Sequence, residues 1–141
     1  MKQEVFIPRG VIDDIYHSGT SAYPNEGCGV LFGNSETITE LVTLPNLEKE
    51  DSACYFRLDP WSVYQMEREA EKKGGEIIGF CHSHADHEAI LSLTDTEYMI
   101  PGMLSVIVSV CAGIPRKIRA YRKSDEGEIR KLKILTESSD Q

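Results

Sequence analysis

The sequence predicts a mixed α/β domain, α+β in its layout, in which a mixed and largely antiparallel β-sheet is flanked by two main helices. Short β-branched or alternating runs bounded by Gly, Pro or Asn outnumber helical patterns by roughly three to one. The two kinds of pattern are interspersed along 141 residues, a length typical of one domain. Because no repeat or Pro/Ser-rich linker divides the chain, we expect a single domain over residues 1–136 and a polar tail at 137–141.

The first third of the chain has the pattern of a strand, a helix and a hairpin. An alternating run at residues 4–7 predicts a strand, and apolar residues at helical spacing after Pro8 predict a helix that ends near Gly19. An apolar run bounded by glycines at 29–33 predicts a buried strand, and the β-branched run at 37–44 is its expected partner.

The clearest helix begins at Asp59, a favourable N-cap residue followed by proline, and ends with a basic turn before Gly74. A shorter helix is expected at residues 93–98, because Pro101 stops it. The remaining strands are expected at residues 55–58, 76–82, 104–110, 117–122 and 129–135.

The composition argues against two classes of partner. With 15 Lys and Arg against 23 Asp and Glu, the chain has a net charge of −8 and no basic block. Such a chain is a poor candidate for binding nucleic acid or an anionic membrane through charge. It has neither a signal-peptide pattern nor an apolar stretch approaching the ~20 residues of a membrane helix, so we expect a cytoplasmic protein.

The four cysteines predict reduced and buried thiols. Cys28, Cys54, Cys81 and Cys111 are widely spaced, without the C-x-x-C pair that indicates a zinc ribbon or a thioredoxin-like site. Each lies among apolar residues, as core thiols usually do.

A histidine pair gives the first indication of chemistry. His82 and His84 are two residues apart at the end of an expected strand, so their imidazoles share one face. Two such imidazoles form half of a zinc site; the alternative is a pair of solvated loop histidines, or one that caps a backbone group. A catalytic zinc needs a third protein ligand, for which the sequence offers Asp86, His87 and Asp95.

Two carboxylates and a serine extend this candidate site. Asp95 follows Ser92 in a Ser-x-x-Asp arrangement at the start of an expected helix, which makes it both a capping residue and a well-oriented ligand candidate. Hydrolysis also needs a base for the proton of water. Glu26 is the best candidate, because the edge of a buried strand reduces solvation and so raises the pKa of a carboxyl group.

Five spaced positions match the signature of a known family: a Glu, then H-x-H, seven residues, Ser, two residues and Asp. They are Glu26, His82, His84, Ser92 and Asp95. The pattern resembles the JAMM, or MPN-plus, zinc metalloproteases, and the resemblance continues to about Tyr121. One departure is Ala85, where the family commonly has proline; the change removes no functional group.

The resemblance implies a cytidine-deaminase-like MPN/JAMM fold and a role for each of these residues. His82, His84 and Asp95 would be ligands of Zn²⁺. Glu26 would be the general base and acid for the attacking water, and Ser92 would steady the oxyanion of the tetrahedral intermediate.

The compact length is similar to that of stand-alone prokaryotic members of the family. The resemblance to those members implies a zinc-dependent peptidase or isopeptidase that cleaves after the C-terminal Gly-Gly of a ubiquitin-like sulfur-carrier protein. We expect the extended tail of that carrier to pair with an exposed strand edge beside the metal. The alternatives are a zinc hydrolase acting on another peptide or a small-molecule amide, and a non-catalytic MPN-type partner-binding module. A homodimer is compatible with each interpretation.

Overall fold

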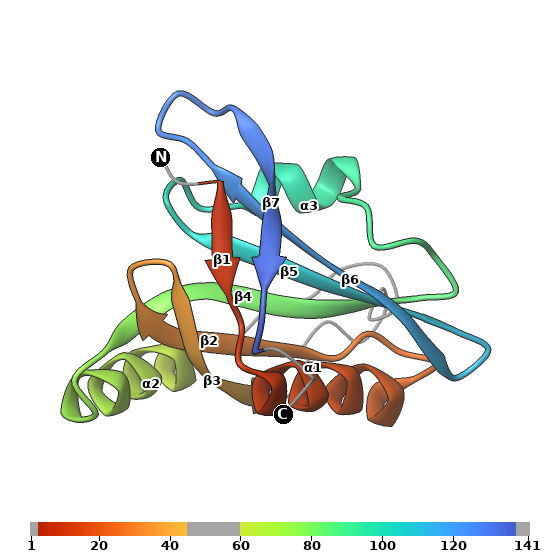
Figure 1. The fold of residues 1–141 in the computed structure, drawn as a ribbon, viewed down its shortest axis with the longest axis horizontal. Coiled ribbons are helices and arrows are strands. Elements are labelled where there is room, and N and C mark those ends of the chain that lie inside the picture. Colours follow the sequence, from red (N-terminus) through yellow and green to blue (C-terminus); the bar gives the residue numbers. More distant parts are fainter. Residues whose placement is uncertain (1–2, 45–59, 138–141) are drawn as a thin grey trace.

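The computed structural model describes residues 3–44 and 60–137. Figure 1 shows the path of the chain through these two ranges. Among the expectations from sequence, the strand at 55–58, the N-cap at Asp59 and the thiol of Cys54 lie outside the described residues.

Seven strands of the described chain close into a barrel in the order β1-β3-β2-β4-β5-β6-β7 (Figure 1). Their bounds are β1 (Glu4–Phe6), β2 (Cys28–Asn34), β3 (Thr37–Leu44), β4 (Glu76–Ala85), β5 (Leu104–Cys111), β6 (Ile114–Lys123) and β7 (Ile129–Leu135). The pairs β1–β3, β1–β7 and β4–β5 are parallel, and the other four are antiparallel. The mixed, largely antiparallel sheet is confirmed, whereas its closure through β1 depends on long-range pairing that local patterns did not predict.

The pairing of β4 bears on one expectation about the surroundings of the histidine pair. Strand β4 pairs with β2 on one side and, from Gly79 to Ala85, with β5 on the other. Strand β2 in turn pairs with β3. From Gly79 to His82 both edges of β4 are therefore hydrogen-bonded, so this part of β4 has no exposed edge for the tail of a carrier. An exposed edge elsewhere beside the metal stays a prediction.

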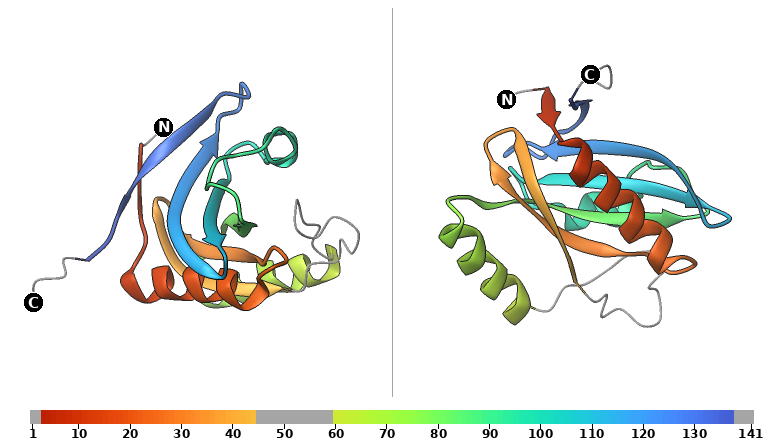
Figure 2. Two further views of the ribbon diagram at one scale, coloured as in Figure 1. Left: turned by 90° about the vertical axis from the view of Figure 1, so that its right-hand side faces the viewer. Right: turned by 60° about the horizontal axis from the view of Figure 1, so that its bottom comes forward.

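Three helices of the described chain cover the two faces of this curved sheet: α1 (Arg9–Ala22), α2 (Pro60–Lys72) and α3 (Leu93–Tyr98). Figure 2 shows α1 crossing one side of the sheet and α3 lying on the other. Val11 and Ile15 of α1 belong to the main core, which fills the inner side of the barrel. Ala70 of α2 packs on the outer side against Val30 and Phe32 of β2. The presence of two main helices and of a short third helix is as the sequence predicts.

Helix α1 continues beyond its predicted end at Gly19 to Ala22. Gly19 is buried, and a Cβ placed on it would come within 3.0 Å of Val110 Cγ2 and 3.1 Å of Val108 Cγ1 on β5. The glycine therefore does not stop the helix. It allows the helix to approach the sheet closely.

A β-bulge sets which side chains of β4 face outward. Adjacent residues of β2 pair with Ile77 and Gly79, which leaves Ile78 as an extra residue in β4. Ile78 faces the inner core, and Phe80 packs in the outer cluster under α2. Because side chains alternate along a strand, the even-numbered residues at 80–84 share the outer face.

The described cysteines and helices bear on two further expectations. Cys28 and Cys81 are buried free thiols as predicted, but Cys111, at the end of β5, is only half-buried. Burial raises the pKa of the Cys28 thiol to about 11 and that of Cys81 to about 12, so neither is a reactive thiolate near neutral pH.

None of the helices in the described ranges is long and apolar enough to cross a membrane.

Candidate metal centre

The second half of β4 places two imidazoles together on the outer face of the sheet. His82 is 4% exposed and His84 is 6% exposed, and their Nε2 atoms are 3.3 Å apart. The convergence predicted from the H-x-H spacing is confirmed. The alternative of two solvated loop histidines is wrong, because both rings are buried.

Helix α3 brings a carboxylate to the same point. Asp95 is the third residue of α3: its N–H donates to Ser92 Oγ at 3.0 Å, and its Oδ2 accepts from the Ser92 N–H at 2.9 Å. This capping box holds the carboxylate so that Oδ1 lies 3.3 Å from His82 Nε2 and Oδ2 lies 3.1 Å from His84 Nε2. Asp95 therefore caps the helix and faces both imidazoles.

The donor set and its spacing fit a zinc ion. With zinc–ligand bonds of 2.0–2.2 Å, the corners of a tetrahedral site lie about 3.3 Å apart. The three separations between His82, His84 and Asp95 are 3.1–3.3 Å. Across the described residues, these three form the one group of His, Cys, Asp or Glu side chains whose ligand atoms all lie within 4.8 Å of one another.

A backbone contact orients the second imidazole. The Nδ1 atom of His84 lies 2.8 Å from the carbonyl oxygen of Glu88, so Nδ1–H donates to that carbonyl. In the neutral ring this leaves the lone pair on Nε2, the atom that faces Asp95. Metal-bound histidines commonly have such a partner on the second nitrogen.

The protonation states also suit metal binding. Burial lowers the pKa of His82, and this effect exceeds the opposing influence of Asp95. Burial alone would lower the pKa of His84 and raise that of Asp95. Hydrogen bonds outweigh burial in both groups. Those with Asp95 and the Glu88 carbonyl raise the pKa of His84, and those with His82 and His84 hold the pKa of Asp95 well below its usual range. Asp95 is therefore ionised and His82 neutral, and these are the states that donate electron pairs to a cation.

The connection between α1 and β2 brings Glu26 beside these groups. The N–H of Gly27 donates to Ser83 Oγ at 2.7 Å, and the N–H of Ser83 donates to the Gly27 carbonyl at 3.0 Å. Glu26 is 3% exposed, and burial followed by the negative charge of Asp95 raises its pKa to about 9. The raised pKa expected at this position is thus found, and its cause is desolvation.

Ser92 lies at the rim of the site and is exposed. Its Oγ accepts the Asp95 N–H, so the hydroxyl hydrogen stays available to donate. The site therefore brings together four buried groups and one hydroxyl that the sequence had singled out.

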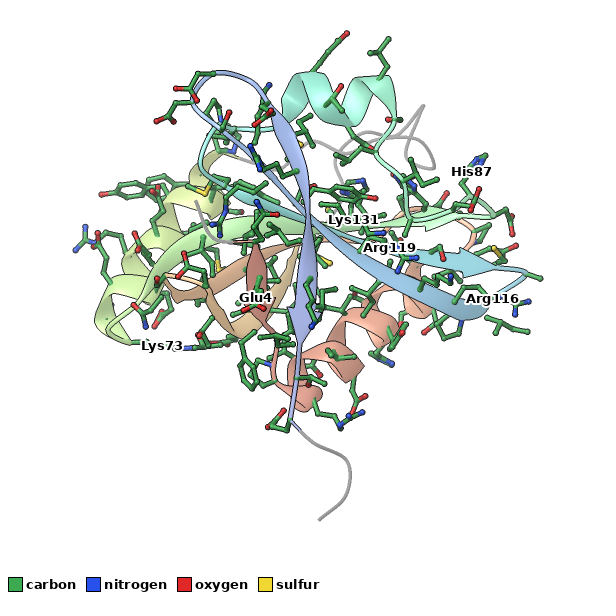
Figure 3. All side chains as sticks on the ribbon, turned by 45° about the horizontal axis from the view of Figure 1, so that its top comes forward. Glu4, Lys73, His87, Arg116, Arg119 and Lys131 are labelled. Atoms are coloured by element: carbon green, nitrogen blue, oxygen red, sulfur yellow. The ribbon has the colours of Figure 1, made fainter. Side chains whose placement is uncertain are left out.

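The two other candidates for the third ligand do not join the histidine pair. Asp86 has a φ of 62°, and its carboxylate accepts from the Tyr23 hydroxyl and from the Ala112 N–H. His87 is exposed, and its ring points outward at the edge of the molecule (Figure 3). The contact between Tyr23 and Asp86 had no signal in the sequence, because the two residues are 63 positions apart.

Comparisons with known proteins agree with this geometry. A family model described as prokaryotic homologs of the JAB domain matches residues 8–124. The desampylase of Haloferax volcanii is 35% identical over 89 residues, which are 61% of this chain and 63% of that protein. The CysO-cysteine peptidase of Mycobacterium tuberculosis is 30% identical over 104 residues, which are 73% of this chain and 71% of that protein.

Solved structures show the same fold. The solution structure of protein DSY2949 from Desulfitobacterium hafniense has a TM-score of 0.80 at 21% identity, covering 96% of this chain and 94% of that one. The crystal structure of AF2198, a JAB1/MPN domain protein from Archaeoglobus fulgidus, has a TM-score of 0.60 at 22% identity, covering 94% and 98%.

The barrel with its outer His-His-Asp group defines a JAB1/MPN-type domain with a candidate metal centre. The chain belongs to the family of prokaryotic JAB-domain homologues, the stand-alone JAMM/MPN group that the sequence resembles. Its match to the desampylase spans 63% of that protein, just under two thirds of the relative's length.

Proposed function

We propose that this chain is a zinc-dependent peptidase or isopeptidase that hydrolyses the bond after the C-terminal Gly-Gly of a ubiquitin-like sulfur-carrier protein. The observation that carries the proposal is the convergence of His82, His84 and Asp95, with the buried Glu26 beside them. Three protein ligands leave one position of a tetrahedral zinc open, as in catalytic rather than structural zinc sites.

The residues of the site would have different roles in hydrolysis. His82, His84 and Asp95 would hold the zinc, which when bound supplies a Lewis acid and lowers the pKa of a water molecule to about 7. Glu26 takes the proton of the attacking water and passes it to the leaving nitrogen. In the metal-free protein its raised pKa means that Glu26 holds a proton near neutral pH. A cation bound beside it would favour the carboxylate form, which is the form that accepts the proton of water. Ser92 donates its hydroxyl hydrogen to the oxyanion of the tetrahedral intermediate.

The substrate class is supported by the relatives and by sterics. The peptidase of Mycobacterium tuberculosis is named for a CysO-cysteine substrate, and the enzyme of Haloferax volcanii is named a desampylase. A tail that ends in Gly-Gly has no side chains near the scissile bond, so its backbone can approach ligands that are only 4–8% exposed. Because both edges of β4 are hydrogen-bonded from Gly79 to His82, we expect the carrier to be held by its folded body as well as by its tail.

The first experiment measures metal and its consequence. The purified protein should hold about one zinc per chain by elemental analysis, in keeping with one three-ligand site. A chelator should abolish cleavage, and added zinc should restore it. A protein that stays free of metal after dialysis against zinc would contradict the enzymatic proposal and favour the partner-binding alternative.

The second experiment tests the substrate. A ubiquitin-like carrier extended beyond its Gly-Gly end should be shortened to that end, as followed by intact mass, and the Glu26→Gln variant should leave it uncut. Unfolded casein-like chains should be poor substrates, because they lack the folded body that positions the tail. Equal rates on casein would contradict the carrier assignment and leave the metallopeptidase assignment standing.

A further inference from the structure

Asp86 connects three segments that are distant in the sequence. Its Oδ1 accepts from the Tyr23 hydroxyl at 2.8 Å and from the Ala112 N–H at 2.9 Å, and its Oδ2 lies 2.9 Å from the same Tyr23 hydroxyl. Its own N–H donates to the Val110 carbonyl at 2.7 Å. One exposed carboxylate therefore joins the end of α1, the end of β4 and the turn between β5 and β6.

The backbone at Asp86 is held in an unfavourable conformation. Its φ of 62° lies in the left-handed region, which non-glycine residues adopt uncommonly, although Asp tolerates it better than most. Such conformations persist when surrounding contacts fix them, and they cluster at functional sites. Here the contacts that fix it are the hydrogen bonds to Tyr23, Val110 and Ala112.

The Tyr23–Asp86 contact lies close in sequence to residues of the metal centre on both sides. Tyr23 precedes Glu26 by three residues, and Asp86 follows His84 by two. On the other side of Glu26, two hydrogen bonds join Gly27 and Ser83: the Gly27 N–H donates to Ser83 Oγ, and the Ser83 N–H donates to the Gly27 carbonyl. Glu26 thus lies between two hydrogen-bonded contacts. The Gly27–Ser83 contact joins its segment to strand β4, which carries the histidines, and the Tyr23–Asp86 contact joins it to the loop after β4.

Gly27 shows how tightly the same segment packs against α1. A Cβ placed on Gly27 would come within 2.8 Å of the Ser18 carbonyl oxygen and 3.2 Å of Ala22 Cβ. The segment is therefore limited by α1 behind it and by β4 beside it. The Tyr23–Asp86 hydrogen bond holds the segment at its other end, where the chain leaves α1.

We propose that Tyr23 and Asp86 are positioning residues that hold the Glu26 segment against the end of β4, so that the Glu26 carboxyl group faces the histidine pair. The inference rests on the proposed function, in which Glu26 handles the proton of the attacking water. Neither residue touches the metal or the substrate; both act through the placement of Glu26.

The test uses variants that separate the hydrogen bond from backbone strain. Tyr23→Phe removes only the hydroxyl, and Asp86→Gly removes the carboxylate while allowing the left-handed φ. Asp86→Asn keeps an acceptor oxygen and tolerates the same φ. Tyr16→Phe is the matched control, because it removes a hydroxyl from a half-buried α1 tyrosine that packs on the inner core.

We expect Tyr23→Phe and Asp86→Gly to lower kcat on the order of 10- to 100-fold, the cost of a small misplacement of a catalytic group. KM and the zinc content should stay near the wild-type values, and Asp86→Asn should restore much of the rate. Tyr16→Phe should behave as wild type. Unchanged kcat in both Tyr23→Phe and Asp86→Gly would overturn the inference.

A readout that does not depend on activity is hydrogen exchange. The Gly27 amide, which donates to Ser83 Oγ, should exchange faster in Tyr23→Phe than in wild type or Tyr16→Phe, in the zinc-loaded and the metal-free protein alike. A uniform rise in exchange over the whole chain would indicate general destabilisation and would contradict a local positioning role.

A double-mutant cycle with Glu26→Gln separates failure of this inference from failure of the proposed function. If Tyr23 acts through Glu26, adding Tyr23→Phe to Glu26→Gln should cost almost nothing more in single-turnover rate. An additive loss would mean that Tyr23 acts by another route. A fully active Glu26→Gln would overturn the proposed function itself, whatever Tyr23→Phe does.

Discussion

The ligand group and Glu26 lie side by side, but the molecule holds them in different ways. His82 and His84 are neighbours on one strand, and Asp95 is only 11 residues beyond His84, fixed by a capping box within its own helix turn. Glu26 lies on a connection between elements. Its placement depends on contacts between residues 56 and 63 positions apart, namely Gly27 with Ser83 and Tyr23 with Asp86.

The difference shows what a local motif can specify. Strand alternation and helix capping are short-range rules, so residue spacing by itself predicts that the two imidazoles share one face and that Asp95 is held at the start of its helix. A residue on a connection has no such rule. Its position is set by packing against distant parts of the chain, and we expect changes there to affect the rate before they affect metal binding.

The largest effect is expected at the ligand group. Asp95→Ala should lose zinc and activity together, because it removes one of three protein ligands; changes merely beside a metal site already cost roughly 10–100-fold in affinity or activity. Elemental analysis and turnover on the same sample would measure both. Asp86→Asn is the control and should keep its zinc. If Asp95→Ala retained metal while Asp86→Asn lost it, the ligand assignment would be wrong.

Glu26→Gln tests the other side of the comparison. The amide keeps the size and polarity of the carboxyl group but cannot take a proton, so kcat should fall by about 10²–10⁴-fold while zinc occupancy stays near one per chain. The variant should also retain the uncut carrier, which co-elution on a sizing column would detect. Zinc loss in Glu26→Gln would make Glu26 a ligand and remove the distinction between Glu26 and the ligand group.

Ser92→Ala should show a smaller, mixed effect, because Ser92 takes part in both the helix cap and the proposed chemistry. Loss of the N-cap should lower the free energy of unfolding by about 1 kcal/mol. Loss of an oxyanion donor should lower kcat on the order of 10²-fold. Ser92→Thr retains a hydroxyl and should lose less of each, as measured by denaturant unfolding and by turnover. Equal losses in Ser92→Ala and Ser92→Thr would point to packing rather than to the hydroxyl.

The last effect concerns stability alone and leaves activity and metal aside: it is the pH dependence of unfolding in the metal-free protein. The Glu26 carboxyl has a pKa of about 9 in the folded state, against an ordinary value of 4.5 in the unfolded state. Between these values the folded state holds a proton that the unfolded state has released, so stability falls as pH rises, by at most about 1.4 kcal/mol per pH unit from this group. Glu26→Gln lacks the titrating group and should lack this part of the slope. Denaturant unfolding of both proteins from pH 5 to pH 8 measures the difference, and parallel slopes would contradict the raised pKa.

Most secondary-structure elements in the described ranges could be predicted from sequence, because their signals are local. The helix at Leu93–Tyr98 and the strand at Ile129–Leu135 have the predicted bounds. Strand β6 begins at Ile114, earlier than the predicted Lys117, because it pairs with β5 up to the turn. Such pairing partners are not visible in a single run of residues.

The sequence by itself determined the chemistry of the site: two imidazoles on one strand face, a capped carboxylate at a helix start, and Glu26 after a turn. Only the tertiary structure decided which face of β4 the imidazoles occupy, because the bulge at Ile78 shifts the alternation. It also decided that Asp86 turns toward Tyr23 and that β1 closes the sheet. The physical reason is range. Alternation and capping act within a few residues, whereas closure, register and the placement of Glu26 require segments to meet that are distant along the chain.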